Sequence, residues 1–111
     1  MLFRSPVEIH PYVEQMPLFG TGNKDLMDWL SKNINYPAIA VERGIQGTVY
    51  IRFVVNADGS VSNAEVMRPV DPYLDKEAIR VINSMPKWMP GKQNGTAVPV
   101  WYNLPIIFQL K

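Results

Sequence analysis

The sequence predicts a two-layer α+β domain in which helices cover one face of a three-stranded sheet. A β-branched and aromatic run at residues 48–55 is typical of a strand, and an Asp-Gly turn returns the chain into a partner strand over residues 60–67. A helical pattern at residues 72–85 then separates this hairpin from an extended apolar segment at residues 97–110. A right-handed crossover places the third strand beyond the first, which gives an antiparallel or mixed sheet of order second-first-third.

Two helices are expected before the hairpin. Apolar residues recur at helical spacing, namely Leu26, Trp29, Leu30 and Ile34. Asn23 is the expected N-cap of this first helix, and Pro37 ends it because the residue before a proline is pushed out of the α region. A second short helix is expected over residues 38–43, closed by Gly44 in the left-handed conformation.

The third helix has a similar core-facing pattern. Its apolar residues are Leu74, Ala78, Val81, Ile82 and Met85. The carboxylates at its start, Asp71, Asp75 and Glu77, have a spacing that could suit an acid–base pair, but acidic groups at a helix start cap N–H groups and complement the dipole. We therefore interpret them as capping residues, with Asp71 as the N-cap and Asp75 as the alternative.

Composition argues against catalysis, a metal or cofactor, and nucleic-acid binding. The 111 residues suffice for one domain, which we divide into an extended arm at residues 1–22 and a folded unit at residues 23–111. Eleven basic residues nearly cancel ten acidic ones, and the net charge of +1 gives no attraction for nucleic acid. Cysteine is absent and His10 is the single histidine, so nothing supports an enzyme. A glycine pair at residues 20 and 22 lacks the lysine of a phosphate loop.

The third strand is expected at an edge of the sheet. It contains Pro99 and Pro105, which donate no ladder hydrogen bond and are therefore confined to edges or bulges. A long apolar edge strand recruits other strands unless it is blocked. Either residues 12–16 of the arm cover this edge, or it stays open and accepts a partner strand by β-augmentation.

Several short motifs in a fixed order resemble the C-terminal domain of the TonB family. They include Asn35-Tyr36-Pro37, Gly44-Ile45-Gln46-Gly47, Asp58-Gly59, Leu74-Asp75 with Ala78, and Trp88 with Pro90-Gly91. The segments at residues 13–17, 85–88, 90–93 and 105–108 are similar to TonB-like proteins of the Bacteroides type. The resemblance extends from about residue 13 to residue 110.

The resemblance implies a periplasmic binding domain that captures the TonB box, an extended peptide of TonB-dependent outer-membrane transporters. The box pairs with the last strand, here Val98, Val100, Trp101, Tyr102, Leu104, Ile106 and Phe108. The segment around Tyr-Pro also contributes, here Asn33, Asn35, Tyr36 and Pro37. A Val100→Pro substitution is expected to weaken peptide binding without unfolding the domain.

The resemblance also implies a longer parent protein. A complete transducer of the family has an N-terminal helix in the inner membrane, which binds the motor proteins, and a Pro-rich spacer. The sequence contains neither, so we expect an excised domain of an anchored protein. The alternative is a self-associating, homodimeric TonB-like module of a larger signalling or envelope protein, which would use the same unprotected edge.

Overall fold

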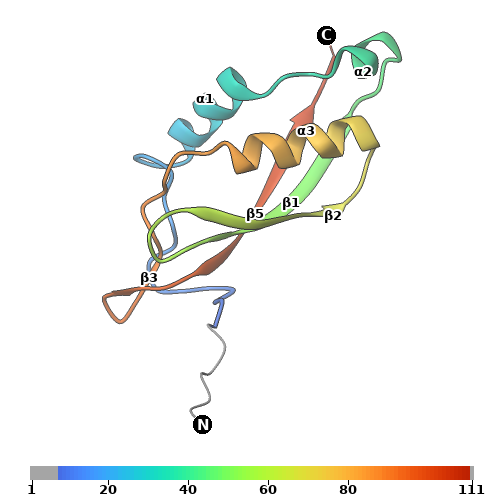
Figure 1. Cartoon of the computed structure of the whole chain (residues 1–111). Helices are drawn as coiled ribbons and strands as arrows, with labels where there is room; N and C mark the ends of the chain where they lie inside the picture. Colours follow the sequence, from blue (N-terminus) through green and yellow to red (C-terminus); the bar gives the residue numbers. More distant parts are fainter. Residues whose placement is uncertain (1–7, 111) are drawn as a thin grey trace.

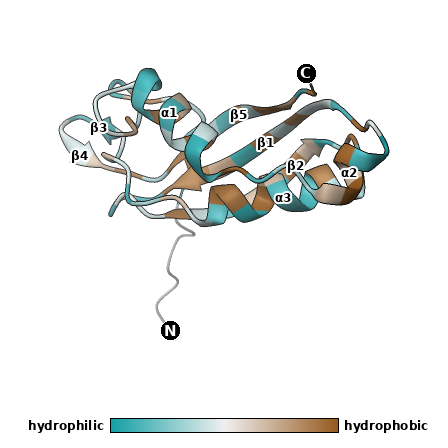
Figure 2. Ribbon diagram, turned by 90° about the horizontal axis from the view of Figure 1, so that it is seen from above, coloured by the Kyte–Doolittle hydropathy of each residue, from teal (hydrophilic) through white to brown (hydrophobic). Residues whose placement is uncertain are grey.

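The computed structural model describes residues 8–110 and confirms the predicted two-layer fold (Figure 1). The elements are α1 (Asn23–Asn33), α2 (Ala38–Glu42), β1 (Gly47–Val55), β2 (Val61–Arg68), α3 (Pro72–Asn83), β3 (Lys92–Gln93), β4 (Thr96–Ala97) and β5 (Val100–Phe108). The main sheet has the order β2-β1-β5, as predicted. Helices α1 and α3 lie on one face of it; seen from above, α1 lies beside β5 and α3 beside β2 (Figure 2).

The two edges of this sheet differ in regularity. Strand β1 pairs antiparallel with both neighbours, and its pairing with β5 runs without a shift from Gly47 opposite Phe108 to Val55 opposite Val100. The pairing of β1 with β2 contains two register shifts, and Asn63 has a φ of 53° beside one of them. Strand β2 therefore contains a bulge near Asn63, and β5 is the long, regular edge.

The core lies between the sheet and its helices. It is formed by Leu26 and Leu30 of α1, Leu74, Ala78, Val81 and Ile82 of α3, Val49, Ile51, Phe53 and Val55 of β1, and Leu104, Ile106 and Phe108 of β5. Trp88 is buried at the centre of an aromatic cluster, with ring centroids 5.4 Å from Phe19, 5.6 Å from Phe53 and 4.8 Å from Tyr102. The expected apolar stripes of both longer helices thus face the sheet.

The helix ends agree with the predictions in part. The Asp71 side chain accepts the Tyr73 N–H at 2.9 Å and is the N-cap of α3, while Asp75 accepts the Val70 N–H at 3.1 Å. The prediction of Asn23 as the N-cap of α1 is wrong. Gly22 holds that position, with a φ of 146°, and Asn23 already lies inside the helix.

The segment after α3 contains more structure than predicted. An Asn-Gly turn, with φ of 53° at Asn94 and 77° at Gly95, joins two short strands, β3 and β4. The last strand consequently begins at Val100 and not at residue 97. Positive φ at both turn residues is the geometry that two-residue hairpins need, which explains the local pairing.

Candidate partner-binding edge of β5

The outer edge of β5, which faces away from β1, presents the backbone groups of its odd-numbered residues. The Trp101 N–H donates outward, to the carbonyl of His10 at 2.9 Å. In an antiparallel ladder, inward and outward backbone groups alternate along the strand, so Asn103 and Ile107 also direct their N–H and C=O groups outward. Within residues 8–110, no backbone segment pairs with these two residues on the outer side.

Both prolines of this region follow the same alternation. Pro99 and Pro105 occupy outward positions, and Pro105 lies opposite Tyr50 without interrupting the β1–β5 ladder. A partner strand along β5 therefore meets the N–H donors of Asn103 and Ile107, a gap at Pro105, and a row of outward carbonyls. The expected Val100→Pro test is misplaced because the Val100 backbone faces β1 and its side chain is fully buried.

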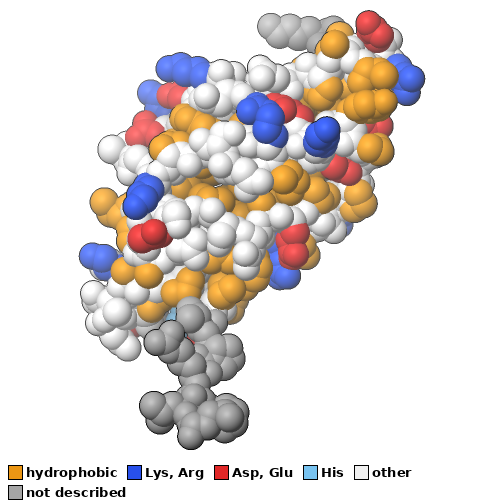
Figure 3. All heavy atoms as spheres, viewed as in Figure 1, with side chains coloured by type: hydrophobic (Ala, Val, Ile, Leu, Met, Phe, Trp, Pro, Cys, Tyr) orange, Lys and Arg blue, Asp and Glu red, His pale blue; other side chains and the backbone are white. Residues whose placement is uncertain are grey.

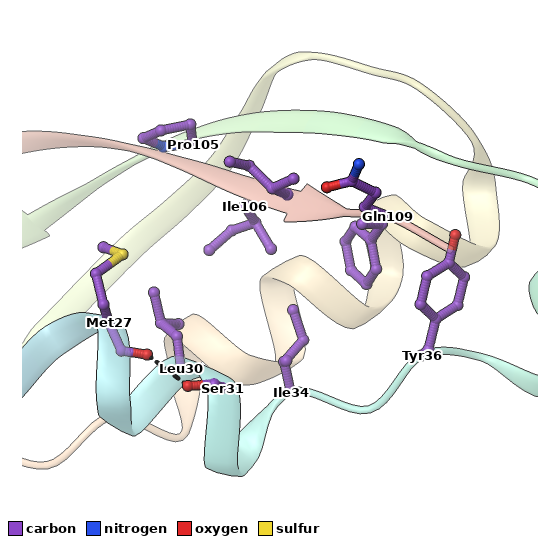
Figure 4. Close-up of a pocket in the computed structure, with 10 residues that line it drawn as sticks. Met27, Leu30, Ser31, Ile34, Tyr36, Pro105, Ile106 and Gln109 are labelled. Carbon is purple, nitrogen blue, oxygen red and sulfur yellow. Dashed lines mark hydrogen bonds between the residues drawn. The ribbon is translucent and has the colours of Figure 1, made fainter. Parts of the chain in front are cut away.

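An open, mostly apolar groove of about 650 Å³ runs beside this edge, between α1 and β5 (Figure 4). We call it the α1–β5 groove; it is lined by Met27, Leu30, Ser31, Ile34, Tyr36, Pro105, Ile106, Ile107, Phe108 and Gln109. Met27 and Leu30 point from α1 toward the strand, whereas Pro105 lies on the other side of the strand (Figure 4). An extended peptide on the outer edge would therefore direct alternate side chains toward this groove.

The structure places the sequence-predicted site residues in several different surroundings. Tyr36, Ile106 and Phe108 line the α1–β5 groove, with the Tyr36 ring 5.4 Å from the ring of Phe108. The even-numbered strand residues turn toward the helices, so Leu104, for example, is buried. Trp101 and Tyr102 are half-buried.

The remaining predicted residues lie elsewhere. Val98 is outside β5 and donates its N–H to the Gly91 carbonyl at 3.1 Å. Asn33 and Asn35 are absent from the groove lining, and Pro37 lines a smaller pocket of about 220 Å³ beside α3.

Sequence reasoning missed the residues that line or form the outer edge itself. Asn103 supplies an outward N–H, and Ile107 supplies both an outward N–H and a side chain that is 66% exposed. One signal could have revealed them. Pro99 and Pro105 are both odd-numbered, and a proline inside a strand is tolerated where its missing N–H would face outward. Asn103 and Ile107 are odd-numbered as well, so their N–H groups are expected to face outward too.

A buried carboxylate holds the segment between α1 and α2 in place. Glu77 of α3 is only 8% exposed and accepts the Asn35 N–H at 2.6 Å. Arg80 donates to the same carboxylate at 2.6 and 2.7 Å and to the Asn33 carbonyl at 2.9 Å. We call this arrangement the Glu77–Arg80 clamp. The prediction that Glu77 caps its helix is wrong, because this carboxylate faces the neighbouring segment.

Electrostatics keep Glu77 charged despite its burial. Burial alone raises the pKa of Glu77, but the hydrogen bonds from Arg80 and the Asn35 N–H, with the charge of Arg80, outweigh it and hold the pKa below its ordinary value. The clamp bonds the backbone on either side of Ile34, and both Ile34 and Tyr36 are in the groove wall. The Tyr36 hydroxyl also donates to the Ile45 carbonyl.

The open face of the sheet carries paired charges. Arg52 forms an ion pair with Glu65 and lies 4.2 Å from the ring centroid of Trp101, while Arg68 lies 5.2 Å from that of Tyr50. On the face seen in Figure 3, basic and acidic side chains are interspersed around hydrophobic ones. Such a surface has no extended field of one sign.

Residues 8–110 contain neither a cluster of metal-ligating side chains nor a membrane-spanning helix. In this part of the chain, no group of three or more His, Cys, Asp or Glu side chains could hold a metal ion. None of the helices described there is long and apolar enough to cross a bilayer. His10 bonds through its backbone to the β5 edge.

The fold and this edge define a small α+β domain with one regular sheet edge open to a further strand. The chain belongs to the TonB C-terminal domain family: residues 32–110 match the family described as "Gram-negative bacterial TonB protein C-terminal". Proteins of this family are energy transducers of transport.

Individual relatives agree with this assignment. The chain is 36% identical to protein TonB2 of Pseudomonas aeruginosa over 76 residues, which are 68% of the chain and 28% of that protein. It is 32% identical to TonB of Helicobacter pylori (strain 26695) over 96 residues, which are 83% of the chain and 32% of that protein. The chain thus spans about a third of the length of these relatives.

Solved structures show the same fold. One NMR solution structure of the Helicobacter pylori TonB C-terminal domain matches with a TM-score of 0.60 at 30% identity, covering 83% of this chain and 86% of that one. A second, of a shorter segment of that domain, gives a TM-score of 0.62 at 30% identity, covering 79% and 92%.

Proposed function

We propose that this domain is the periplasmic part of a TonB-like energy transducer and binds the TonB box of outer-membrane transporters by strand addition to β5. The observation that supports this most directly is the outer edge of β5. It is regular, its outward groups at Asn103 and Ile107 are unpaired, and an apolar groove runs beside it. The opposite edge, on β2, is bulged, and bulges discourage pairing.

The edge supports sequence-tolerant recognition. Backbone hydrogen bonds supply affinity in β-augmentation, and pockets for alternate side chains supply preference. Here the outward backbone groups would bond to any extended peptide, and the α1–β5 groove would favour apolar side chains at every second position. One transducer of this kind can serve several transporters.

The proposed strand pairing also suits the transfer of force. A load applied along a paired strand is shared by several hydrogen bonds at once, so a small interface resists a pull. In the proposed parent protein, an inner-membrane anchor and its motor proteins would supply this pull, and the paired TonB box would carry it to the transporter.

Amide chemical shifts test this proposal. A synthetic TonB-box peptide is added to the ¹⁵N-labelled domain, and the expected shifts concentrate at Asn103, Ile107 and the groove residues Leu30 and Ile34. The β2 edge, represented by Asn63, is the internal control and should not shift. Shifts confined to β2, or none at millimolar peptide, would refute the proposal.

A second candidate function uses the same edge differently. Two copies of the chain could pair through their β5 edges and form a homodimer, because an unprotected regular edge accepts any strand. Sedimentation velocity separates the two candidates. A monomer at the highest soluble concentration rules out self-pairing, and a dimer whose Asn103 and Ile107 amides are already protected favours it.

A further inference from the structure

The N-terminal arm reaches the same sheet edge that the proposed partner would use. His10 donates its N–H to the Pro99 carbonyl at 3.0 Å and accepts the Trp101 N–H at 2.9 Å. This forms a parallel bridge between His10 and Val100. The first outward positions beside β5 are therefore already occupied by a segment of the chain itself.

The arm leaves the edge directly after this bridge. Backbone groups of successive residues alternate in direction, so Pro11 faces away from β5, and Tyr12, the next residue that could pair, makes no backbone hydrogen bond to the strand. The Tyr12 side chain is 75% exposed. The arm thus makes one bridge at the Pro99 end of the edge and then leaves it, so that the edge beyond Trp101 stays open.

The rest of the arm is held more firmly. Val13 is buried, and Gln15 exchanges two backbone hydrogen bonds with Lys92, at 3.1 and 2.8 Å. Leu18 exchanges two more with Met89, at 3.0 and 2.8 Å. The His10 bridge lies outside these anchors, between the exposed residues Glu8 and Pro11. It can open while residues 13–19 stay in place.

We propose that residues 8–11 are a built-in competitor strand, which occupies the Pro99–Trp101 end of the β5 edge and limits how far a partner peptide can pair. This inference rests on the proposed function. A peptide that spans only residues 103–107 of β5 binds without contacting the arm. A longer peptide pairs with Trp101 and Pro99 only after it has displaced His10, and it loses affinity by the free energy of the His10 bridge.

A variant of the arm tests this directly in the full chain. His10→Pro removes the N–H that bonds to Pro99 and weakens the bridge, and Tyr12→Ala is the matched control because Tyr12 takes no part in it. Hydrogen exchange of the Trp101 amide is measured first, without any peptide. It should be faster in His10→Pro and unchanged in Tyr12→Ala; equal rates in all three proteins would overturn the bridge as a competitor.

Two synthetic peptides then separate the inference from the proposed function. One is a five-residue TonB box, and the other carries two further residues at each end. The longer peptide should bind His10→Pro about tenfold more tightly than the unchanged chain, equivalent to about 1.4 kcal/mol. The five-residue peptide should bind both proteins equally.

The other possible binding results distinguish failure of the competitor strand from failure of strand addition. Equal affinity of the longer peptide for both proteins, or an equal gain for the five-residue peptide, would overturn the competitor strand while strand addition itself stands. If neither peptide binds either protein, the proposed function fails, and the competitor strand fails with it.

Discussion

Removal of the Glu77 carboxylate should loosen the groove wall and destabilise the domain. The carboxylate accepts one hydrogen bond from a backbone N–H, that of Asn35, and two from Arg80. A Glu77→Ala substitution leaves the Asn35 N–H unpaired in a part-buried position and Arg80 without its counter-charge. A Glu77→Gln substitution keeps an acceptor for Asn35 and loses mainly the charge, so it is the matched control.

The expected loss of unfolding free energy follows from how exposed the hydrogen-bond partners of Glu77 are. A hydrogen bond to a charged group contributes about 1.5–3 kcal/mol. The Arg80 side chain is 46% exposed, so solvent screening reduces its share to about 0.5 kcal/mol. We expect Glu77→Ala to lower the free energy of unfolding by about 2–3 kcal/mol, and Glu77→Gln by about 1 kcal/mol. Urea denaturation measures both values.

The pH dependence of the free energy of unfolding gives a second, independent measure of the Glu77 contribution. The folded-state pKa of Glu77 lies below its ordinary value, which is about 4.3 in an unfolded chain. The stabilisation from the charged Glu77 carboxylate is therefore complete above the unfolded-chain pKa. It is lost as the pH falls through the lower, folded-state pKa. Asp25 and Asp58 also have lowered pKa values and give a slope of the same sign, so the relevant quantity is the difference between the unchanged chain and Glu77→Gln. Parallel profiles, or a loss below about 0.5 kcal/mol in Glu77→Ala, would refute this account of the clamp.

Three further substitutions test the fold. Gly59→Ala should cost about 3 kcal/mol or more, because Gly59 has a φ of 88° and a Cβ there would collide with the Trp88 carbonyl; thermal unfolding measures it. Gly95→Ala is its counterpart, with a φ of 77° but open space around it, and should cost about 1 kcal/mol; equal losses would contradict the collision. Asp71→Ala should cost about 1 kcal/mol through the lost N-cap, and an unchanged melting temperature would argue against that cap.

The fold could be predicted because each of its main signals is local. Strand β1 alternates, the turn at Asp58-Gly59 has positive φ at its glycine, and Asp71 with Pro72 begins a helix. The order of the sheet then follows from one handedness rule. The missed hairpin of β3 and β4 consists of two-residue strands, which are too short to give a periodic signal.

The candidate site was harder to predict because it depends on which side of β5 faces outward. The family resemblance implies contacts along the whole last strand, and its apolar run gives no alternation that would separate the two sides, so Val98 and Val100 are expected beside Trp101 as equivalent contacts. The structure separates them because Val100 is buried and bonds toward β1. The groove residues Met27 and Ile34 come from α1 and from the residue that follows it, which are distant from β5 in the sequence, and no local pattern links them to the strand.

The most direct test of strand addition compares Ile107→Pro with Ile107→Ala. Both remove the exposed side chain, but only the proline removes the outward N–H, and neither disturbs the bonds between β5 and β1. In a TonB-box peptide titration, with the fold checked by amide shifts, Ile107→Pro should bind about tenfold more weakly than Ile107→Ala, as expected for the loss of one backbone donor. Equal affinity of the two folded variants would contradict backbone pairing at this edge.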